Sequence, residues 1–295
     1  MLAFAVAEVY FWTMRKLRFA TVGLGAVGSA LTPALAEAGH RPLFLVGRGR
    51  KREQQLARRL KTRLLRSLPN DIENIDFILV TIPTATLAAY AGKLATRDLP
   101  WKKLVFVHAA GPLGIEPFAP LAKLGAGVAA MHPYQTFPKR QRSVTLDGVI
   151  YGVTGDRRGA RLARRIAREL GGQPVMIKEA DRVLYHLSAV VACGFTAANL
   201  EIAGSILAGL GIAKTSRERA TRAIAEETIR NVKALGTRAA MTGPAARGDV
   251  NGVRRHLREL QKRRPELADC YEEMSRYMLA ARPSRKAVKK SKRSK

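Results

Sequence analysis

The sequence contains only two cysteines, Cys193 and Cys270, among 295 residues. Two cysteines so far apart match neither a disulfide framework nor the paired spacing of a zinc site. The string His-Glu-x-x-His, which marks another kind of zinc site, is also missing. We therefore expect no bound metal, and a reducing, cytoplasmic location suits the two thiols.

Acidic residues are also scarce, with 23 Asp and Glu against 52 Lys and Arg and a formal net charge of +29. Eight of these cations lie in the acid-free segment 282–295, whose composition predicts a disordered basic tail. Such charge attracts nucleic acid or another polyanion, but arginines on solvated helix faces of a basic proteome give the same composition. No pattern of interleaved aromatic and basic residues indicates sequence-specific recognition of nucleic acid. We therefore expect at most non-specific nucleic-acid contact by the tail.

The N-terminus lacks the features of a targeting signal or a membrane anchor. Residues 1–13 are apolar, but no basic residue precedes them and Glu8 interrupts them. A secretory signal begins with positive charge, and a transmembrane helix needs about 20 apolar residues. We expect residues 1–13 to be a loosely attached extension or a mis-assigned start, with Met14 leading into the first strand.

One long apolar segment lies further along the chain. Residues 187–213 carry a single charge, Glu201, and are long enough to cross a membrane. Their many Ala and Gly residues, together with Asn199 and Glu201, favour instead a helix buried between subunits or against the first domain. We therefore expect no membrane span and a homodimer formed through the helical domain, because a monomer would expose a large apolar patch.

The order of patterns predicts an α/β fold. Up to about residue 178, short β-rich runs alternate with helical periodicity, which predicts βαβ units and a parallel sheet, and beyond it the pattern is almost entirely helical. We expect an N-terminal Rossmann domain over 14–178 and an all-α domain over 179–281. The expected strands span 17–22, 42–46, 77–82, 103–107, 127–131, 149–153 and 175–177, and the expected helices span 27–38, 51–65, 87–94, 157–170, 187–213, 217–235, 250–262 and 267–279.

A glycine-rich turn follows the first expected strand and consists of Gly23, Leu24, Gly25, Ala26, Val27 and Gly28. The pattern Gly-x-Gly-x-x-Gly is weak by itself, but a strand before it and a helix after it are the context of a dinucleotide site. In such a site the first glycine allows the tight turn, the second lets the backbone approach the pyrophosphate, and the third permits close helix–strand packing. A tight turn that binds nothing is the alternative.

The end of the second expected strand bears on which dinucleotide binds. A site for NAD places Asp or Glu about 20 residues after the turn, against the ribose 2′-hydroxyl. Here Gly47 and Arg48 follow the strand, and no acid stands there. Because Arg can form bidentate hydrogen bonds to a phosphate, Arg48 at this position favours NADP over NAD. Surface arginine in an Arg-rich chain is the alternative.

Several strings make the chain resemble a known family: Val107–Gly111 (VHAAG), Met131–Phe137 (MHPYQTF), Tyr185–His186 and Thr242–Asp249 (TGPAARGD). From Met14 to about Leu279 the chain is similar to a family of predicted NADP oxidoreductases with a Rossmann-like domain and a helical C-terminal domain of unknown function. That family lies in the 6-phosphogluconate dehydrogenase-like superfamily, which includes pyrroline-5-carboxylate reductase and deazaflavin-dependent NADP reductases. The family often has Ser in place of Ala110 and Asn in place of Gly194, which leaves open an altered substrate or activity.

The resemblance implies a catalytic residue near the start of the long helix, which makes His186 the first candidate for general acid–base catalysis. His132 is the second candidate and His108 the third, because each follows an expected strand and histidine suits proton transfer near neutral pH. Each histidine could instead hold a loop or cap a helix. We further expect Gln135, Tyr185 and Arg247 to bind substrate and Ile82 and Pro83 to contact the cofactor.

These features predict an NADP-dependent oxidoreductase that transfers hydride to or from a small carbonyl or imine, or the matching hydroxyl or amine, at a cleft between the two domains. Two alternatives remain. The chain could bind NADP as a sensor or regulator without turnover, or it could bind a polyanion through its basic tail.

Overall fold

The computed structural model describes residues 15–72, 74–138 and 144–281. The extension expected over residues 1–13 and the basic tail expected over 282–295 lie outside the described residues. Internal contacts divide the chain into two compact units, and the division falls between Thr196 and Ala197. The domain boundary expected at residue 178 stays a prediction.

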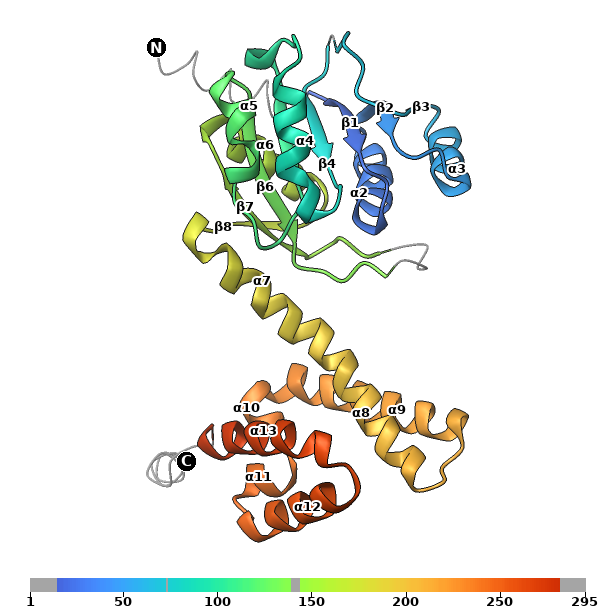
Figure 1. The fold of residues 1–295 in the computed structure, drawn as a ribbon, viewed down its shortest axis with the longest axis vertical. Helices are drawn as coiled ribbons and strands as arrows, with labels where there is room; N and C mark the ends of the chain where they lie inside the picture. The colour runs from blue at the N-terminus through green and yellow to red at the C-terminus, as the bar shows by residue number, and fades with distance from the viewer. Residues whose placement is uncertain (1–14, 73, 139–143, 282–295) are drawn as a thin grey trace. The chain divides into compact units, whose positions relative to one another are not determined.

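The first unit is organised around an eight-stranded sheet with the strand order β3-β2-β1-β4-β5-β6-β7-β8 (Figure 1). Neighbouring strands from β3 to β6 pair in parallel, as the alternation of strands and helices predicts. β7 is antiparallel to β6 and parallel to β8, so the last two strands run the opposite way. The strands are β1 (Arg18–Val22), β2 (Arg41–Val46), β3 (Arg63–Leu65), β4 (Phe77–Val80), β5 (Val105–His108), β6 (Gly127–Pro133), β7 (Ile150–Gly155) and β8 (Gln173–Met176).

The prediction of a helix over residues 51–65 is wrong at the C-terminal end. Helix α3 spans Lys51–Arg59, and Lys61 then adopts a left-handed conformation with φ 50°, which ends the helix. The residues that follow form the short strand β3, in which Leu64 pairs with Leu45 of β2. A strand of three residues is too short to show a period-two pattern, so the helical periodicity before it concealed the strand.

Helices cover both faces of this sheet, because successive side chains of a strand point to opposite sides. On one face, Leu35 of α2 and Ile166 of α6 pack in the cluster that contains Phe19 of β1. On the other face, Leu94 of α4 packs in the cluster that contains Ala20, the next residue of the same strand. The helical segments are α2 (Ala26–Glu37), η1 (Thr84–Thr86), α4 (Leu87–Ala95), η2 (Trp101–Lys103), η3 (Glu116–Phe118), α5 (Ala119–Lys123) and α6 (Arg157–Glu169).

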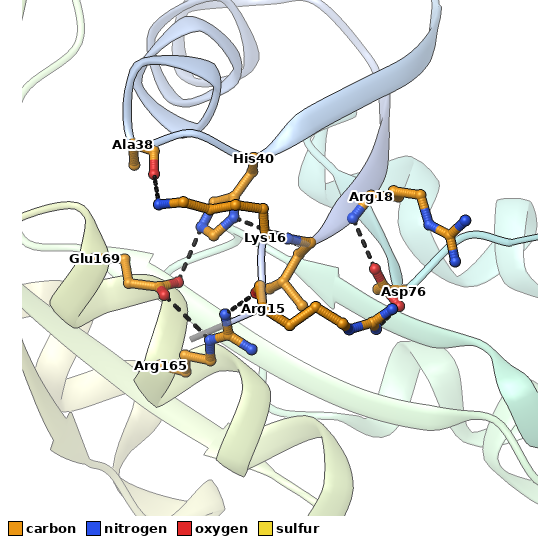
Figure 2. Close-up of polar contacts among 9 residues, drawn as sticks. Arg15, Lys16, Arg18, Ala38, His40, Asp76, Arg165 and Glu169 are labelled. Carbon is orange, nitrogen blue, oxygen red and sulfur yellow. Dashed lines mark hydrogen bonds and ion pairs between the residues drawn. The ribbon is translucent and has the colours of Figure 1, made fainter. Parts of the chain in front are cut away.

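A polar network lies where β1, β2 and β4 begin (Figure 2). The fully buried His40 side chain accepts a hydrogen bond from the Leu17 N–H at 3.2 Å through Nδ1, and its Nε2 lies 2.9 Å from Glu169 Oε2. Arg165 Nε contacts the other oxygen of Glu169 at 3.2 Å. Burial lowers the pKa of His40 although Glu169 acts in the opposite direction. The network therefore joins α6 to the corner between α2 and β2 through a neutral imidazole, at the edge of the sheet away from the strands' carboxyl ends.

Residues from Glu179 to Gly209 are helical throughout. Among the described residues this is the one helix that is long and apolar enough to cross a membrane, with a mean hydropathy of 1.6 in its most apolar window, and none of that window is buried. Its expected burial between subunits or against the first domain stays a prediction. It consists of η4 (Glu179–Asp181), α7 (Arg182–Val190), the π-helical turn η5 (Val191–Phe195) and α8 (Thr196–Gly209).

The C-terminal region is helical, as predicted. Gly248 ends α11 in a left-handed conformation with φ 79°, which favours glycine. Asp249 then caps the next helix, since its Oδ1 accepts the Gly252 N–H at 2.8 Å. The helical segments are α9 (Lys214–Leu235), α10 (Thr237–Ala240), α11 (Gly243–Arg247), α12 (Val250–Arg263), η6 (Pro265–Leu267) and α13 (Ala268–Ala280).

Candidate functional site

The glycine-rich turn links β1 to α2 with the geometry that its sequence predicts. Gly23 has φ 90° and donates its N–H to Val46 O at 2.9 Å. A Cβ at Gly28 would overlap both Gly23 O and Thr81 Oγ1. Thr81 Oγ1 itself donates to Gly23 O at 2.5 Å. Only glycine therefore fits at the third position, and Thr81, the residue after β4, ties the turn to the end of that strand.

The start of α2 is open to an anionic ligand. Its N-cap, Gly25, has no side chain to cap the helix, so the first N–H groups have no capping partner there. A Cβ at Gly25 would meet no protein atom within 4 Å, yet the residue lines a pocket. The room at this glycine is therefore on the ligand side, which fits the close approach of a pyrophosphate.

This pocket has a volume of about 910 Å³ and lies where several strands of the sheet end. All of its lining residues belong to the first unit. The lining includes Gly23, Leu24, Gly25, Ala26, Val27, Gly47, Arg48, Ile82, Pro83, His132 and His186, all of them expected site residues. Gly28, a buried residue of α2, is not among the lining residues. His108, Gln135 and Tyr185 are not among the lining residues, and Arg247 belongs to the second unit.

His132 is the last residue but one of β6, and His186 lies on α7. Their rings are 5.4 Å apart between centroids and nearly perpendicular. Among the described residues neither Nδ1 has a hydrogen-bond partner, although both atoms are buried. Burial, with smaller contributions from His186 and Arg182, lowers the pKa of His132 to about 3. Burial and then Arg182 also lower the pKa of His186, so both imidazoles are neutral at pH 7.

His108 is placed differently from the other two histidines. Its side chain is fully buried, its Nε2 lies 2.6 Å from Gly114 O, and its Nδ1 accepts the Ala110 N–H at 3.2 Å. Burial lowers its pKa to about 4. Because backbone groups occupy both ring nitrogens, the geometry favours a role in holding the loop after β5.

The expected substrate-binding side chains Tyr185 and Gln135 are engaged within the protein. Tyr185 Oη donates to His132 O at 3.1 Å and accepts the Gly152 N–H at 3.0 Å. Gln135 Nε2 donates to Thr145 O at 3.2 Å. Tyr185 thus fixes the backbone at His132. Substrate binding by Gln135, Tyr185 and Arg247 stays a prediction.

Arg182, which sequence reasoning missed, lies one helical turn before His186. Its side chain is 1% exposed, and its guanidinium donates to Leu113 O at 2.9 Å, Gly152 O at 3.0 Å and Ala110 O at 2.8 Å. It therefore joins α7 to β7 and to the loop that lines the pocket, and its charge opposes protonation of both pocket histidines. No local pattern marks such a residue, because its partners are distant in sequence.

Two further side chains shape the pocket beside Gly47. Glu53, in the first turn of α3, is 7% exposed, and its Oε2 accepts the Arg50 N–H at 2.9 Å. An acid is therefore present near the end of β2, although none stands directly after the strand, where a site for NAD places one. Its carboxylate caps helix α3. Arg66, the residue after β3, also lines the pocket and donates to Arg48 O.

Two family models match the sequence. One, the Rossmann-like domain, matches residues 12–133, and the other, a domain of unknown function named DUF2520, matches residues 149–278. The chain therefore joins a Rossmann-like domain to a DUF2520 domain. The predicted fold class and the resemblance that the motif strings indicated are thereby confirmed. The sequence matches none of the curated proteins.

The fold is similar to that of several solved structures with low sequence identity. A candidate NADP oxidoreductase from Bacteroides fragilis is 22% identical with a TM-score of 0.72, covering 90% of this chain and 98% of that one. A Thermotoga maritima protein is 24% identical with a TM-score of 0.69, covering 89% and 97%. A pyrroline-5-carboxylate reductase from Streptococcus pyogenes is 15% identical with a TM-score of 0.61, covering 90% and 99%. At these identities the likeness shows the fold.

Proposed function

We propose that the chain is an NADP-dependent oxidoreductase that transfers hydride to or from a small carbonyl or imine substrate. The observation that carries this proposal is a single pocket lined both by the glycine-rich turn with Arg48 and by the neutral pair His132 and His186. Two of the similar structures are named for NADP-linked oxidoreduction and for reduction of pyrroline-5-carboxylate, a cyclic imine. Their names support the reaction class.

The residues of the pocket divide the work of such a reaction. When bound, the nicotinamide supplies or accepts the hydride, and the protein provides orientation and proton transfer. A neutral imidazole accepts a proton, so His186 takes the proton of an amine or alcohol during oxidation and returns it in the reverse direction. His132, held through its carbonyl by Tyr185, orients the substrate beside His186 and is the second candidate for the proton-transfer role.

Replacing Arg48 with alanine is expected to weaken NADPH binding about tenfold, because a charge-assisted hydrogen bond to the 2′-phosphate is lost. NADH affinity should change less than about twofold, since NADH carries no group at that position. Fluorescence titration of both cofactors measures this. Arg58→Ala removes an exposed arginine of α3 outside this pocket and serves as the control. Equal weakening of both cofactors, or none, would contradict the assignment of NADP.

Turnover separates an enzyme from a sensor that binds the cofactor without reaction. We expect NADPH to be oxidised in the presence of 2-methyl-1-pyrroline, 1-pyrroline-5-carboxylate or 2-butanone as test substrates. Tight NADPH binding without turnover of any imine or ketone would favour the sensor. Ala110 and Gly194, which stand where the resembling family often has Ser and Asn, are the positions to exchange in that case.

We also propose that two copies of the chain associate through the apolar face of α7 and η5. Val183, Leu187, Val191 and Phe195 follow one another at intervals of four residues and are 48–64% exposed, which places them on one side of the helix. Sedimentation equilibrium is expected to show a dimer that Leu187→Glu converts to a monomer. Ala192→Glu, on another side of the helix, is the control. A monomeric wild-type chain would overturn this part of the proposal.

A further inference from the structure

Arg66 lies beside Arg48 because of the register between two neighbouring parallel strands. Leu65, the last residue of β3, pairs with Val46, the last residue of β2, and the Gly47 N–H donates to Leu65 O at 3.0 Å. The chain therefore leaves both strands at the same edge of the sheet. Arg48 and Arg66 follow at that edge, and both line the pocket.

The guanidinium of Arg66 lies against the loop that carries Arg48. It donates to Arg48 O. A Cβ at Gly49, where φ is 73°, would lie only 2.6 Å from Arg66 Nη2 and 2.7 Å from Cζ. A bare glycine at this position thus leaves the space that the guanidinium occupies. Because the side chain itself is exposed, this contact positions it without burying its charge.

Three arginines, Arg48, Arg50 and Arg66, line this part of the pocket. Over the part of the chain that the structure describes, none of them forms an ion pair with a carboxylate. Glu53 is the acidic residue of the lining, and one of its oxygens accepts the Arg50 N–H. Three positive charges that line one pocket favour the binding of an anion, and a phosphate monoester carries a charge of about −1.5 to −2.

We propose that Arg66 determines the preference for NADP by binding the 2′-phosphate together with Arg48 and by holding the Arg48 loop in place. The inference rests on the proposed function, which places a dinucleotide in this pocket. In a Rossmann domain the adenosine ribose lies at the end of the second strand, where Gly47, Arg48 and Arg66 converge. The planar guanidinium of arginine suits a phosphate better than the point charge of lysine.

Binding of two adenosine nucleotides without a nicotinamide tests the inference separately from turnover. Calorimetric titration should show that the wild-type chain binds 2′,5′-ADP at least about tenfold more tightly than 5′-ADP. Arg66→Ala should weaken binding of 2′,5′-ADP about tenfold and change 5′-ADP affinity less than about twofold. Arg66→Lys keeps the positive charge but lacks the planar guanidinium and its paired N–H donors. It should give an intermediate loss of affinity for 2′,5′-ADP.

Arg63→Ala is the matched control, because Arg63 is an exposed arginine of β3, the strand just before Arg66, and does not line this pocket. Equal losses in the Arg63 and Arg66 variants would show a general effect of charge and would overturn the inference. A wild-type chain that binds the two nucleotides equally would also overturn it, while leaving an NAD-dependent reaction open. Binding of neither nucleotide would overturn the proposed function as well.

Discussion

Replacing Arg182 with methionine is expected to lower the free energy of unfolding by about 2–4 kcal/mol. The guanidinium is buried and donates to the carbonyls of Leu113, Gly152 and Ala110 at 2.8–3.0 Å. Methionine keeps an unbranched apolar side chain and removes every donor, so these carbonyls lose their hydrogen bonds from the guanidinium. Each buried acceptor left unpaired costs about 1–3 kcal/mol, and the relief of desolvating a buried charge offsets part of that sum.

Urea unfolding at pH 7 measures this change. Arg164→Met, which removes an exposed arginine of α6, is the matched control and should alter the free energy of unfolding by less than about 0.5 kcal/mol. If the two variants lose the same stability, the three carbonyl contacts of Arg182 do not carry the effect.

The same variant should change the titration of the pocket histidines. Burial is the main cause of the lowered pKa values of His132 and His186, and the charge of Arg182 adds to it in both. Removal of that charge should therefore raise both pKa values toward the ordinary value of about 6.5. NMR titration of the imidazole protons in the folded variant measures the shift. A purely structural Arg182 would leave both values where they are in the wild type.

Local sequence patterns were sufficient to predict most strands and helices of the first unit. The turn from Gly23 to Gly28 fixes a strand before it and a helix after it, because each glycine answers a separate steric demand. The apolar run at the start of residues 77–82 forms a strand because both faces of the sheet are covered. The direction of β7 was not predictable, since an apolar run reads the same in a parallel and an antiparallel pair.

The residues that escaped sequence reasoning act over long distances in the chain. Arg182 contacts carbonyls that lie 30, 69 and 72 residues away, and Arg66 contacts Arg48 across 18 residues. In an arginine-rich sequence neither differs from its solvated neighbours until strand register and burial are known. Glu53 escaped for a different, local reason: it accepts the Arg50 N–H only three residues away, but an Arg at the N-cap does not give the Ser/Thr-x-x-Glu pattern of a capping box.

Replacing His186 with alanine is expected to lower kcat/KM about 100-fold or more, because a positioned acid–base group contributes about 10²–10⁴-fold to such a reaction. NADPH affinity should change less than about twofold, since the proton-transfer group contacts substrate rather than the phosphates. Reduction of the test imine or ketone that the wild-type chain turns over provides the rate, and fluorescence titration provides the affinity. His256→Asn is the control, because His256 is an exposed residue of α12 that does not line this pocket.

The pH dependence of kcat/KM tests whether His186 acts as a base in the oxidation direction. The pKa of His186 is lowered by burial first and by Arg182 second, so its base form prevails at every pH above that lowered value. In the oxidation direction kcat/KM should thus be level through neutral pH and fall only as the pH drops through the lowered pKa, below 6.5. His186→Ala should abolish this fall. If His132→Ala abolishes it instead, while the His186 variant keeps it, the proton acceptor is His132.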